Sequence, residues 1–153
     1  MIERLVSGGQ TGIDRAALDA ALAAGLPCGG WCPRGRVADD GTIPARYPLW
    51  ETPSADPSQR TRWNVRDSDG TLVICSPPPA GGTALAMDHA RTLGKPVLVV
   101  DEGSQLAHIC GWIDRHRVRV LNVAGPRESE QAGIYIAARS LLDGLLAEPT
   151  RGE

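Results

Sequence analysis

The sequence lacks phenylalanine altogether and has no long apolar run, and neither basic nor acidic residues dominate it. Its 16 Lys and Arg face 18 Asp and Glu, which leaves a net charge of −2 at pH 7. Such a balance gives no long-range attraction for polyanions, so we expect neither nucleic acid nor a membrane surface as a partner. No apolar stretch approaches the roughly 20 residues that cross a bilayer, and Met1–Arg4 offers no apolar signal segment. We therefore expect a cytoplasmic protein.

Cysteine is scarce and poorly spaced for metal binding. Only Cys28 and Cys32 lie close together, and the three histidines at 89, 108 and 116 supply no matching second pair of ligands. The sequence predicts no metal site and four free thiols, with Cys75 buried at a strand end as a small hydrophobic residue.

Short apolar segments alternate with segments of helical period along most of the chain. The alternation predicts one α/β domain over residues 1–147: a doubly wound, mainly parallel sheet of about five or more strands, with helices on both faces and right-handed crossovers. Residues 148–153 are expected to form a frayed tail. Strands are expected at 4–7, 71–75, 97–100 and 118–123, and helices at Ile13–Ala24, Arg60–Arg66, Ala86–Leu93, Leu106–Ile113 and Ile134–Leu145.

Residues 29–59 show no sustained period and are rich in Pro, Gly and charge. A structureless stretch of that length in a compact domain is more often functional than idle, which indicates a lid or a partner surface. Three of the four tryptophans, Trp31, Trp50 and Trp63, lie in or beside it. Core filling or an oligomer interface is their plainer interpretation, and stacking of Trp31 or Trp63 on a base is the alternative.

Three glycine-rich turns stand where an expected strand gives way to a helix. The parallel arrangement brings such turns to one edge of the sheet, where ligands of open α/β sheets bind. Helix N-termini carry unpaired N–H groups and a positive dipole end, and glycine at positive φ lets an anion approach them closely. The alternative is that each is an ordinary tight turn. The turns contain Gly8, Gly9, Gln10, Thr11 and Gly12; then Gly81, Gly82 and Thr83; then Asn122 with Gly125, Pro126, Arg127, Glu128 and Ser129.

Asp14 is unexpected at an anion site, because a carboxylate in the first helical turn competes with a bound anion. Two interpretations stay open: Asp14 pairs with Thr11 in a capping box, or it contacts a hydroxyl group or metal of the ligand. Charge compensation is expected from arginine, with Arg127 the strongest candidate. The other arginines considered are Arg15, Arg34, Arg36, Arg60 and Arg62.

Several blocks together strongly resemble the putative molybdenum carrier family, also described as circularly permuted YpsA-like proteins of the SLOG superfamily. The resemblance covers nearly the whole chain, and it is more specific than any one glycine motif. The blocks are SGGQTGIDR at 7–15, GWCPRGR at 30–36, DGTIP at 40–44, YPL at 47–49, RTRWNVRDSDGT at 60–71 and NVAGPRES at 122–129.

This resemblance implies a Rossmann-like fold that holds a nucleotide or a molybdenum cofactor between the first glycine turn and the Gly-Gly-Thr turn. A second similarity, to the Lonely Guy phosphoribohydrolases, places Arg60 where that family has an upstream arginine. Ala84, Leu85 and Ala86 follow Thr83, so the family's catalytic glutamate has no counterpart here.

The leading hypothesis is a binding module for a phosphorylated nucleotide-like or molybdopterin-like molecule, with Gln10, Thr11, Asn64, Asn122 and Arg127 giving specificity. The alternatives are a nucleotide-processing hydrolase or transferase acting at the ribosyl carbon, and an interaction scaffold built on the Trp-rich loop. For the enzyme, Asp14, Glu51, Asp88 and Glu128 are equal candidates for the acid or base. We expect a homo-oligomer, a dimer or higher, in each case.

Overall fold

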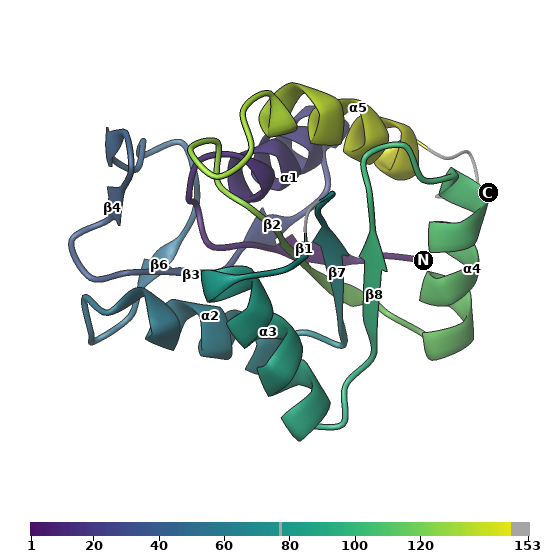
Figure 1. The fold of residues 1–153 in the computed structure, drawn as a ribbon, viewed down its shortest axis with the longest axis horizontal. Helices are drawn as coiled ribbons and strands as arrows, with labels where there is room; N and C mark the ends of the chain where they lie inside the picture. The colour runs from purple at the N-terminus through teal and green to yellow at the C-terminus, as the bar shows by residue number, and fades with distance from the viewer. Residues whose placement is uncertain (77, 148–153) are drawn as a thin grey trace.

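A five-stranded parallel sheet forms the centre of the computed structural model, which describes residues 1–76 and 78–147 (Figure 1). The tail predicted at 148–153 lies outside the described residues. In spatial order the strands are β2 (Cys28–Gly29), β1 (Arg4–Val6), β9 (Val120–Ala124), β7 (Gly70–Ile74) and β8 (Val97–Val100). The expected α/β class and parallel pairing are confirmed.

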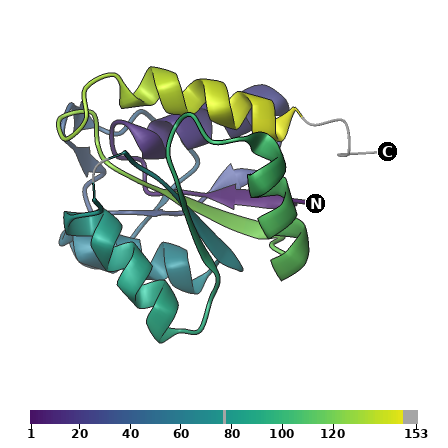
Figure 2. The same cartoon turned by 45° about the vertical axis from the view of Figure 1, so that its right-hand side comes forward.

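Helices cover both faces of this sheet, as expected (Figures 1 and 2). α1 (Ile13–Ala24) packs beside α5 (Ile134–Leu146), which also contacts α4 (Leu106–His116). On the opposite face α2 (Pro57–Arg66) packs beside α3 (Gly81–Thr92). Small side chains make the close packing possible, because Ala16, Ala17, Ala20 and Ala21 on α1 are all buried.

The two edges of the sheet differ from what the sequence indicates. The strand expected at 97–100 is present as β8, but it is an edge strand, and Val99 is 42% exposed. Residues 28 and 29 were not expected to be a strand, yet they form the opposite edge through parallel pairing with Leu5 and Val6. A two-residue strand carries no periodicity that a sequence pattern could reveal.

The region 29–59 is more ordered than its sequence indicates. β3 (Trp31–Cys32) pairs with β6 (Trp50–Glu51), and β4 (Val37–Ala38) forms an antiparallel pair with β5 (Gly41–Thr42). The helix expected at 60–66 begins earlier, at Pro57, where the Asp56 side chain accepts a hydrogen bond from the Ser58 N–H at 2.9 Å.

One guanidinium organises the centre of that region. Arg36 donates to the backbone carbonyls of Ile43, Pro44, Tyr47 and Leu49, at 2.8 to 3.3 Å. Carbonyls from four residues thereby converge on a single charged group, which replaces the sheet bonds that this segment lacks. Arg36 is therefore a structural cation, and its side chain is not available for the ligand role considered from the sequence.

We expect Arg36→Met to lower the free energy of unfolding by about 3 kcal/mol, because it removes several charge-assisted hydrogen bonds at once. Urea unfolding followed by tryptophan fluorescence measures the change. Arg34→Met is the matched control: Arg34 is exposed, so its replacement should change stability by less than about 0.5 kcal/mol. Equal effects of the two substitutions would contradict the role given to Arg36.

Candidate functional site

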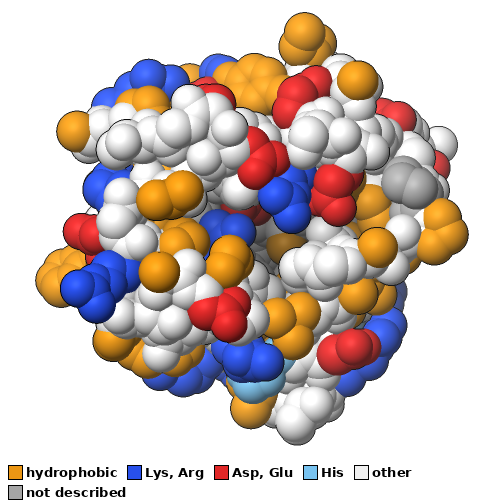
Figure 3. All heavy atoms as spheres, turned by 60° about the vertical axis from the view of Figure 1, so that its left-hand side comes forward, with side chains coloured by type: hydrophobic (Ala, Val, Ile, Leu, Met, Phe, Trp, Pro, Cys, Tyr) orange, Lys and Arg blue, Asp and Glu red, His pale blue; other side chains and the backbone are white. Residues whose placement is uncertain are grey.

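A cleft opens at the carboxyl edge of the sheet, above the ends of β1, β9 and β7 (Figure 3). Its cavity volume is about 70 Å³, below the range of sites that enclose a whole small molecule, so it has room for one small group of a ligand while the rest lies in the open mouth. All three glycine-rich junctions reach it, together with α2. The lining residues are Gly8, Gln10, Asp14, Arg60, Thr61, Asn64, Gly82, Thr83, Ala86, Asn122, Val123, Ala124, Gly125, Arg127 and Glu130.

α2 supplies one wall through Arg60, Thr61 and Asn64. Asn64 is fixed by two hydrogen bonds to the backbone of Trp31: its Oδ1 accepts from the N–H at 2.8 Å, and its Nδ2 donates to the carbonyl at 3.0 Å. The inner side of α2 is held by Val65, which packs against Ala86 and Ala90 of α3. These contacts make the wall rigid, as an arrangement for binding requires.

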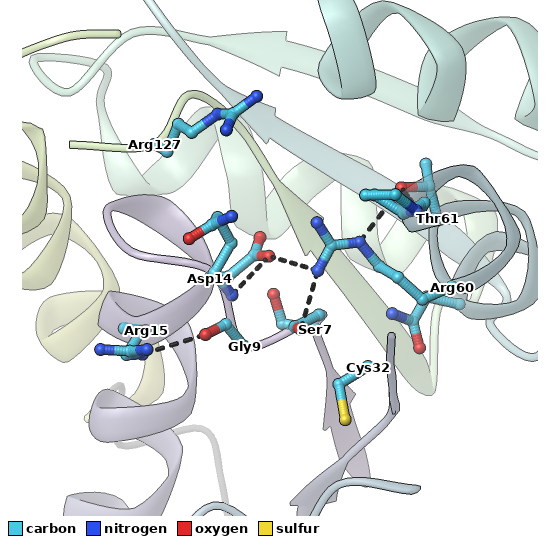
Figure 4. A network of polar contacts seen from close by, with 12 residues as sticks. Ser7, Gly9, Asp14, Arg15, Cys32, Arg60, Thr61 and Arg127 are labelled. Carbon is cyan, nitrogen blue, oxygen red and sulfur yellow. Dashed lines mark hydrogen bonds and ion pairs between the residues drawn. The ribbon is translucent and has the colours of Figure 1, made fainter. Parts of the chain in front are cut away.

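Asp14 and Arg60 form a partly buried pair across the floor of the cleft (Figure 4). Arg60 Nη1 donates to the Gly8 carbonyl at 2.8 Å and lies 3.7 Å from Asp14 Oδ2, and each side chain is only 13–14% exposed. The same Oδ2 accepts from the Gln10 N–H at 3.2 Å. Burial raises the pKa of the Asp14 carboxyl above its ordinary value, and the Arg60 charge opposes that rise only in part.

The capping box expected from Thr11 and Asp14 is wrong. No side chain caps α1 at Gly12, because the Thr11 hydroxyl instead accepts a hydrogen bond from the Glu128 N–H at 3.3 Å. Asp14 accepts from Gln10, outside the helix, and faces the cleft. Of the two interpretations of this carboxylate, the structure excludes helix capping.

The first glycine turn is occupied by the protein itself. The Ile13 N–H donates to the Pro126 carbonyl at 3.2 Å, and the Thr11 N–H donates to Gln10 Oε1 at 2.9 Å. A Cβ at Gly12 would lie 2.5 Å from the Pro126 carbonyl oxygen. The glycines here allow chain segments to meet, and much of the α1 N-terminus is already hydrogen-bonded.

The explanation given from the sequence for Gly8 and Gly9 also changes. Gly9 does have a positive φ of 82°, but a Cβ there would meet Leu49 at 2.5 Å, whereas Gly8 has no positive φ and packs against Arg60. Neither glycine opens space for a ligand. Gly9, Thr11 and Gly12 do not line the cleft.

The second junction is open. No described residue accepts a hydrogen bond from the N–H of Gly81 or Gly82, and no side chain caps α3. Both glycines are exposed, and a Cβ on Gly82 would meet only Thr61 Oγ1, at 4.0 Å. The unpaired amides and the positive dipole end of α3 therefore remain available to an anion.

Residues of the third junction lie both inside and outside the cleft. Arg127 lines the cleft and pairs with Asp39 at 3.0 Å and with Glu130 at 3.3 Å. Glu128 lies outside the cleft and accepts hydrogen bonds from the N–H groups of Gly133 and Tyr135, at the start of α5. Ser129 also lies outside and donates to Asp39.

Of the remaining candidate residues, Asn122 lines the cleft and the arginines at 15, 34 and 62 do not. Arg15 binds Asp40 and the Gly9 carbonyl, away from the cleft. Asn122 lines the cleft and donates to the Thr71 hydroxyl at 3.2 Å, on the neighbouring strand. Neither Arg34 nor Arg62 is among the residues that line the cleft.

The tryptophans of the irregular region lie outside the cleft, so they have no place in base stacking within it. Trp31 makes edge contacts with Trp63 and Trp50 at centroid distances of 4.8 and 6.3 Å, and Trp50 is 72% exposed. Trp112, by contrast, is buried in the core.

Sequence reasoning missed three participants: Thr61, Glu130 and Asp39. Thr61 was detectable as the neighbour of Arg60 on a helix that also carries Asn64. Glu130 and Asp39 gave no sequence signal, because Asp39 reaches Arg127 across 88 residues of chain.

We expect Asp39→Asn to tighten the binding of inorganic phosphate a few-fold, because Arg127 loses its anionic competitor and the pair is surface-exposed. Isothermal titration calorimetry measures the dissociation constant. Asp40→Asn is the control, since Asp40 binds Arg15 outside the cleft. If the two substitutions act alike, Asp39 does not restrain a ligand-binding arginine.

Comparison with known proteins shows the family of this chain. The circularly permutated YpsA SLOG family model matches residues 5–146. The chain belongs to this family. Its structure is also similar to the crystal structure of a protein from Syntrophus aciditrophicus SB described as a putative molybdenum carrier protein, with 44% identity, a TM-score of 0.90 and coverage of 95% of this chain and 96% of that one. No curated protein gives a significant match.

As a member of the SLOG family, the chain has the Rossmann-like architecture that its sequence blocks imply. Within residues 1–76 and 78–147, no helix is long and apolar enough to cross a membrane. The same residues hold no cluster of three or more His, Cys, Asp or Glu side chains suited to a metal ion. Cys28, Cys32 and Cys75 are free thiols, and Cys75 is buried.

Proposed function

We propose that the cleft binds a small molecule carrying one phosphate group, of nucleotide-like or molybdopterin-like type. One observation carries the proposal: the N–H groups of the exposed residues Gly81 and Gly82 have no acceptor among the described residues, and Gly82 lines a cleft that Arg60 and Arg127 also line. Backbone amides and arginine are the donors that phosphate sites use.

The charges of the cleft favour a monophosphate over a di- or triphosphate. Arg60 and Arg127 are matched by two carboxylates, Asp14 and Glu130, so the lining has no excess positive charge. A phosphate about 4 Å from the Asp14 carboxylate would be repelled by about 4 kcal/mol at an effective dielectric of 20. The phosphate therefore sits at α3 and away from Asp14.

The similar protein is described as a putative molybdenum carrier protein, which supports a ligand of the molybdenum-cofactor type. The molybdopterin of such a cofactor carries a phosphate. A nucleoside monophosphate presents the same group. Native mass spectrometry of freshly purified protein distinguishes the two ligands, because the mass of a co-purified molecule identifies it. The proposal would be refuted if the wild-type protein bound no phosphate, carried no co-purified molecule and showed no thermal shift with adenosine monophosphate or molybdopterin.

A second candidate function, cleavage at the ribosyl carbon, is supported by one observation. Among the four carboxylates considered, Asp14 alone lines the cleft: Glu51 accepts from the Gly35 N–H, Asp88 is 75% exposed and Glu128 binds the start of α5. Free base released from nucleoside monophosphates, and lost in Asp14→Asn, would establish the enzyme. A pure binding protein releases none.

We also propose a cytoplasmic homo-oligomer. The exposure of Trp50 and Val37, both in the irregular region, supports an interface there. Light scattering of Trp50→Ser against the wild type tests it, since a lower mass for the variant is the expected result. If the chain is instead an interaction scaffold, this surface should bind a different protein and the mass of the chain alone should not depend on Trp50.

A further inference from the structure

The chemistry of the cleft indicates which part of a phosphorylated ligand it recognises. Among the described residues, no aromatic side chain lines the cleft, so a base or pterin ring has no stacking partner there. Besides Arg60, Arg127 and Glu130, its polar lining consists of groups that hydrogen-bond hydroxyls: three amides, two threonines and one carboxylate. These are Gln10, Asn64, Asn122, Thr61, Thr83 and Asp14.

Asp14 is the strongest acceptor of this set, and its orientation is fixed. The Gln10 N–H and the Arg60 guanidinium hold Oδ2, at 3.2 and 3.7 Å. Figure 4 shows the other carboxylate oxygen pointing away from Ser7, toward the side of the cleft on which Arg127 lies. The Ser7 hydroxyl donates to the Val123 carbonyl at 2.7 Å and also lies beside the Asp14 carboxyl, where it lowers the pKa of that group.

A carboxylate oxygen that faces the cleft can accept a hydrogen bond from a donor on the ligand. A second cation is disfavoured beside Arg60, whereas a neutral hydroxyl donates to the carboxylate without like-charge repulsion. Arg60 is then a positioning residue for Asp14, and the phosphate occupies the other end of the cleft, at Gly81 and Gly82.

Resting on the proposed function, we infer that the cleft recognises the sugar-phosphate part of its ligand, with a ligand hydroxyl group donating to Asp14 and the ring system left outside the cleft. The inference narrows the proposed ligands to hydroxylated phosphate monoesters, such as nucleotides, and excludes molybdopterin, which has no sugar. It also makes Asp14 a specificity residue, although a carboxylate in the first turn of α1 disfavours an anion beside it.

The test compares four probes by isothermal titration calorimetry: inorganic phosphate, ribose 5-phosphate, n-pentyl phosphate and adenosine monophosphate. In the wild type, ribose 5-phosphate should bind about tenfold tighter than n-pentyl phosphate, the effect of a hydrogen bond to a charged group. Adenosine monophosphate should bind within about tenfold of ribose 5-phosphate, since the base lacks the stacking that aromatic side chains provide.

Asp14→Ala should reduce the preference for ribose 5-phosphate over n-pentyl phosphate to about one and tighten inorganic phosphate binding, because the carboxylate's repulsion is removed. A merely structural role would weaken all four probes alike. Asp14→Asn keeps an acceptor for the Gln10 N–H and carries the test if the alanine variant does not fold; it should reduce the preference in part. Asp88→Ala, on the exposed side of α3, is the control.

The outcomes separate this inference from the function on which it rests. Equal binding of ribose 5-phosphate and n-pentyl phosphate, tight binding of adenosine monophosphate alone, or an undiminished preference in Asp14→Ala would overturn the inference and leave phosphate binding intact. Failure of every probe to bind would overturn both.

Discussion

Gly82→Leu is expected to raise the dissociation constant for phosphate a hundredfold or more, while the fold stays intact. Gly82 is exposed in the first turn of α3, and a Cβ there meets nothing closer than Thr61 Oγ1 at 4.0 Å. The new side chain would therefore occupy the cleft and cover the amides that we propose as the anion site. Leucine also favours helix over glycine by roughly 0.8 kcal/mol, so stability should not fall. Titration calorimetry and thermal unfolding measure the two effects.

Gly111→Leu is the matched control. Gly111 lies within α4, and a Cβ there meets no atom within 4 Å, but the residue is not part of the cleft. Both variants should unfold at or above the wild-type temperature, and only Gly82→Leu should lose phosphate. Undiminished binding by Gly82→Leu would show that the anion does not sit on α3.

Removing the guanidinium of Arg60 is expected to have the second-largest effect, on stability as well as on binding. Arg60→Met leaves Asp14 partly buried without its cation and the Gly8 carbonyl without its donor. Breaking one partner of such a pair costs about 3 kcal/mol of unfolding free energy. Phosphate affinity should fall by about tenfold, because the cleft loses a positive charge while the Asp14 carboxylate remains. Urea unfolding and calorimetry measure these changes.

The double variant Arg60→Met with Asp14→Asn should recover most of the lost stability, since no uncompensated charge remains. The pH dependence has a definite sign. Because the folded-state pKa of Asp14 lies above its unfolded value of 3.8, ionisation of Asp14 destabilises the fold as pH rises through that window. The deficit of Arg60→Met should therefore be largest at neutral pH and shrink in acid. A deficit independent of pH and of residue 14 would argue against the pair.

The sheet, its helices and the convergence of three glycine junctions were predictable, because apolar runs and glycine punctuation record them locally. Leu72, Val73 and Ile74 are continuously apolar and are buried in β7, an interior strand of the sheet. Arg60, Asn64, Gly82 and Arg127 could likewise be named from the sequence as candidates, and all of them line one cleft.

The sequence could not reveal which hydrogen-bond donors and glycines are already engaged in contacts within the protein and which remain open to a ligand. Gly8, Gly9 and Gly12 have the composition of an anion site, but Arg60, Leu49 and Pro126 fill the space around them. Arg36 and Arg127 look alike in sequence, yet one holds four carbonyls of a loop and the other lines the cleft. Such differences depend on contacts between distant segments, and no local pattern records those.

The central claim is that a phosphate group rests on the N-terminus of α3. Titration of inorganic phosphate into the ¹⁵N-labelled protein, followed by amide NMR spectra, tests it most directly. The account predicts that the amide resonances of Gly81 and Gly82 shift most, while that of Ile13, already bonded to Pro126, stays nearly unmoved. Larger shifts at the α1 turn than at Gly81 and Gly82, or none at either, would contradict it.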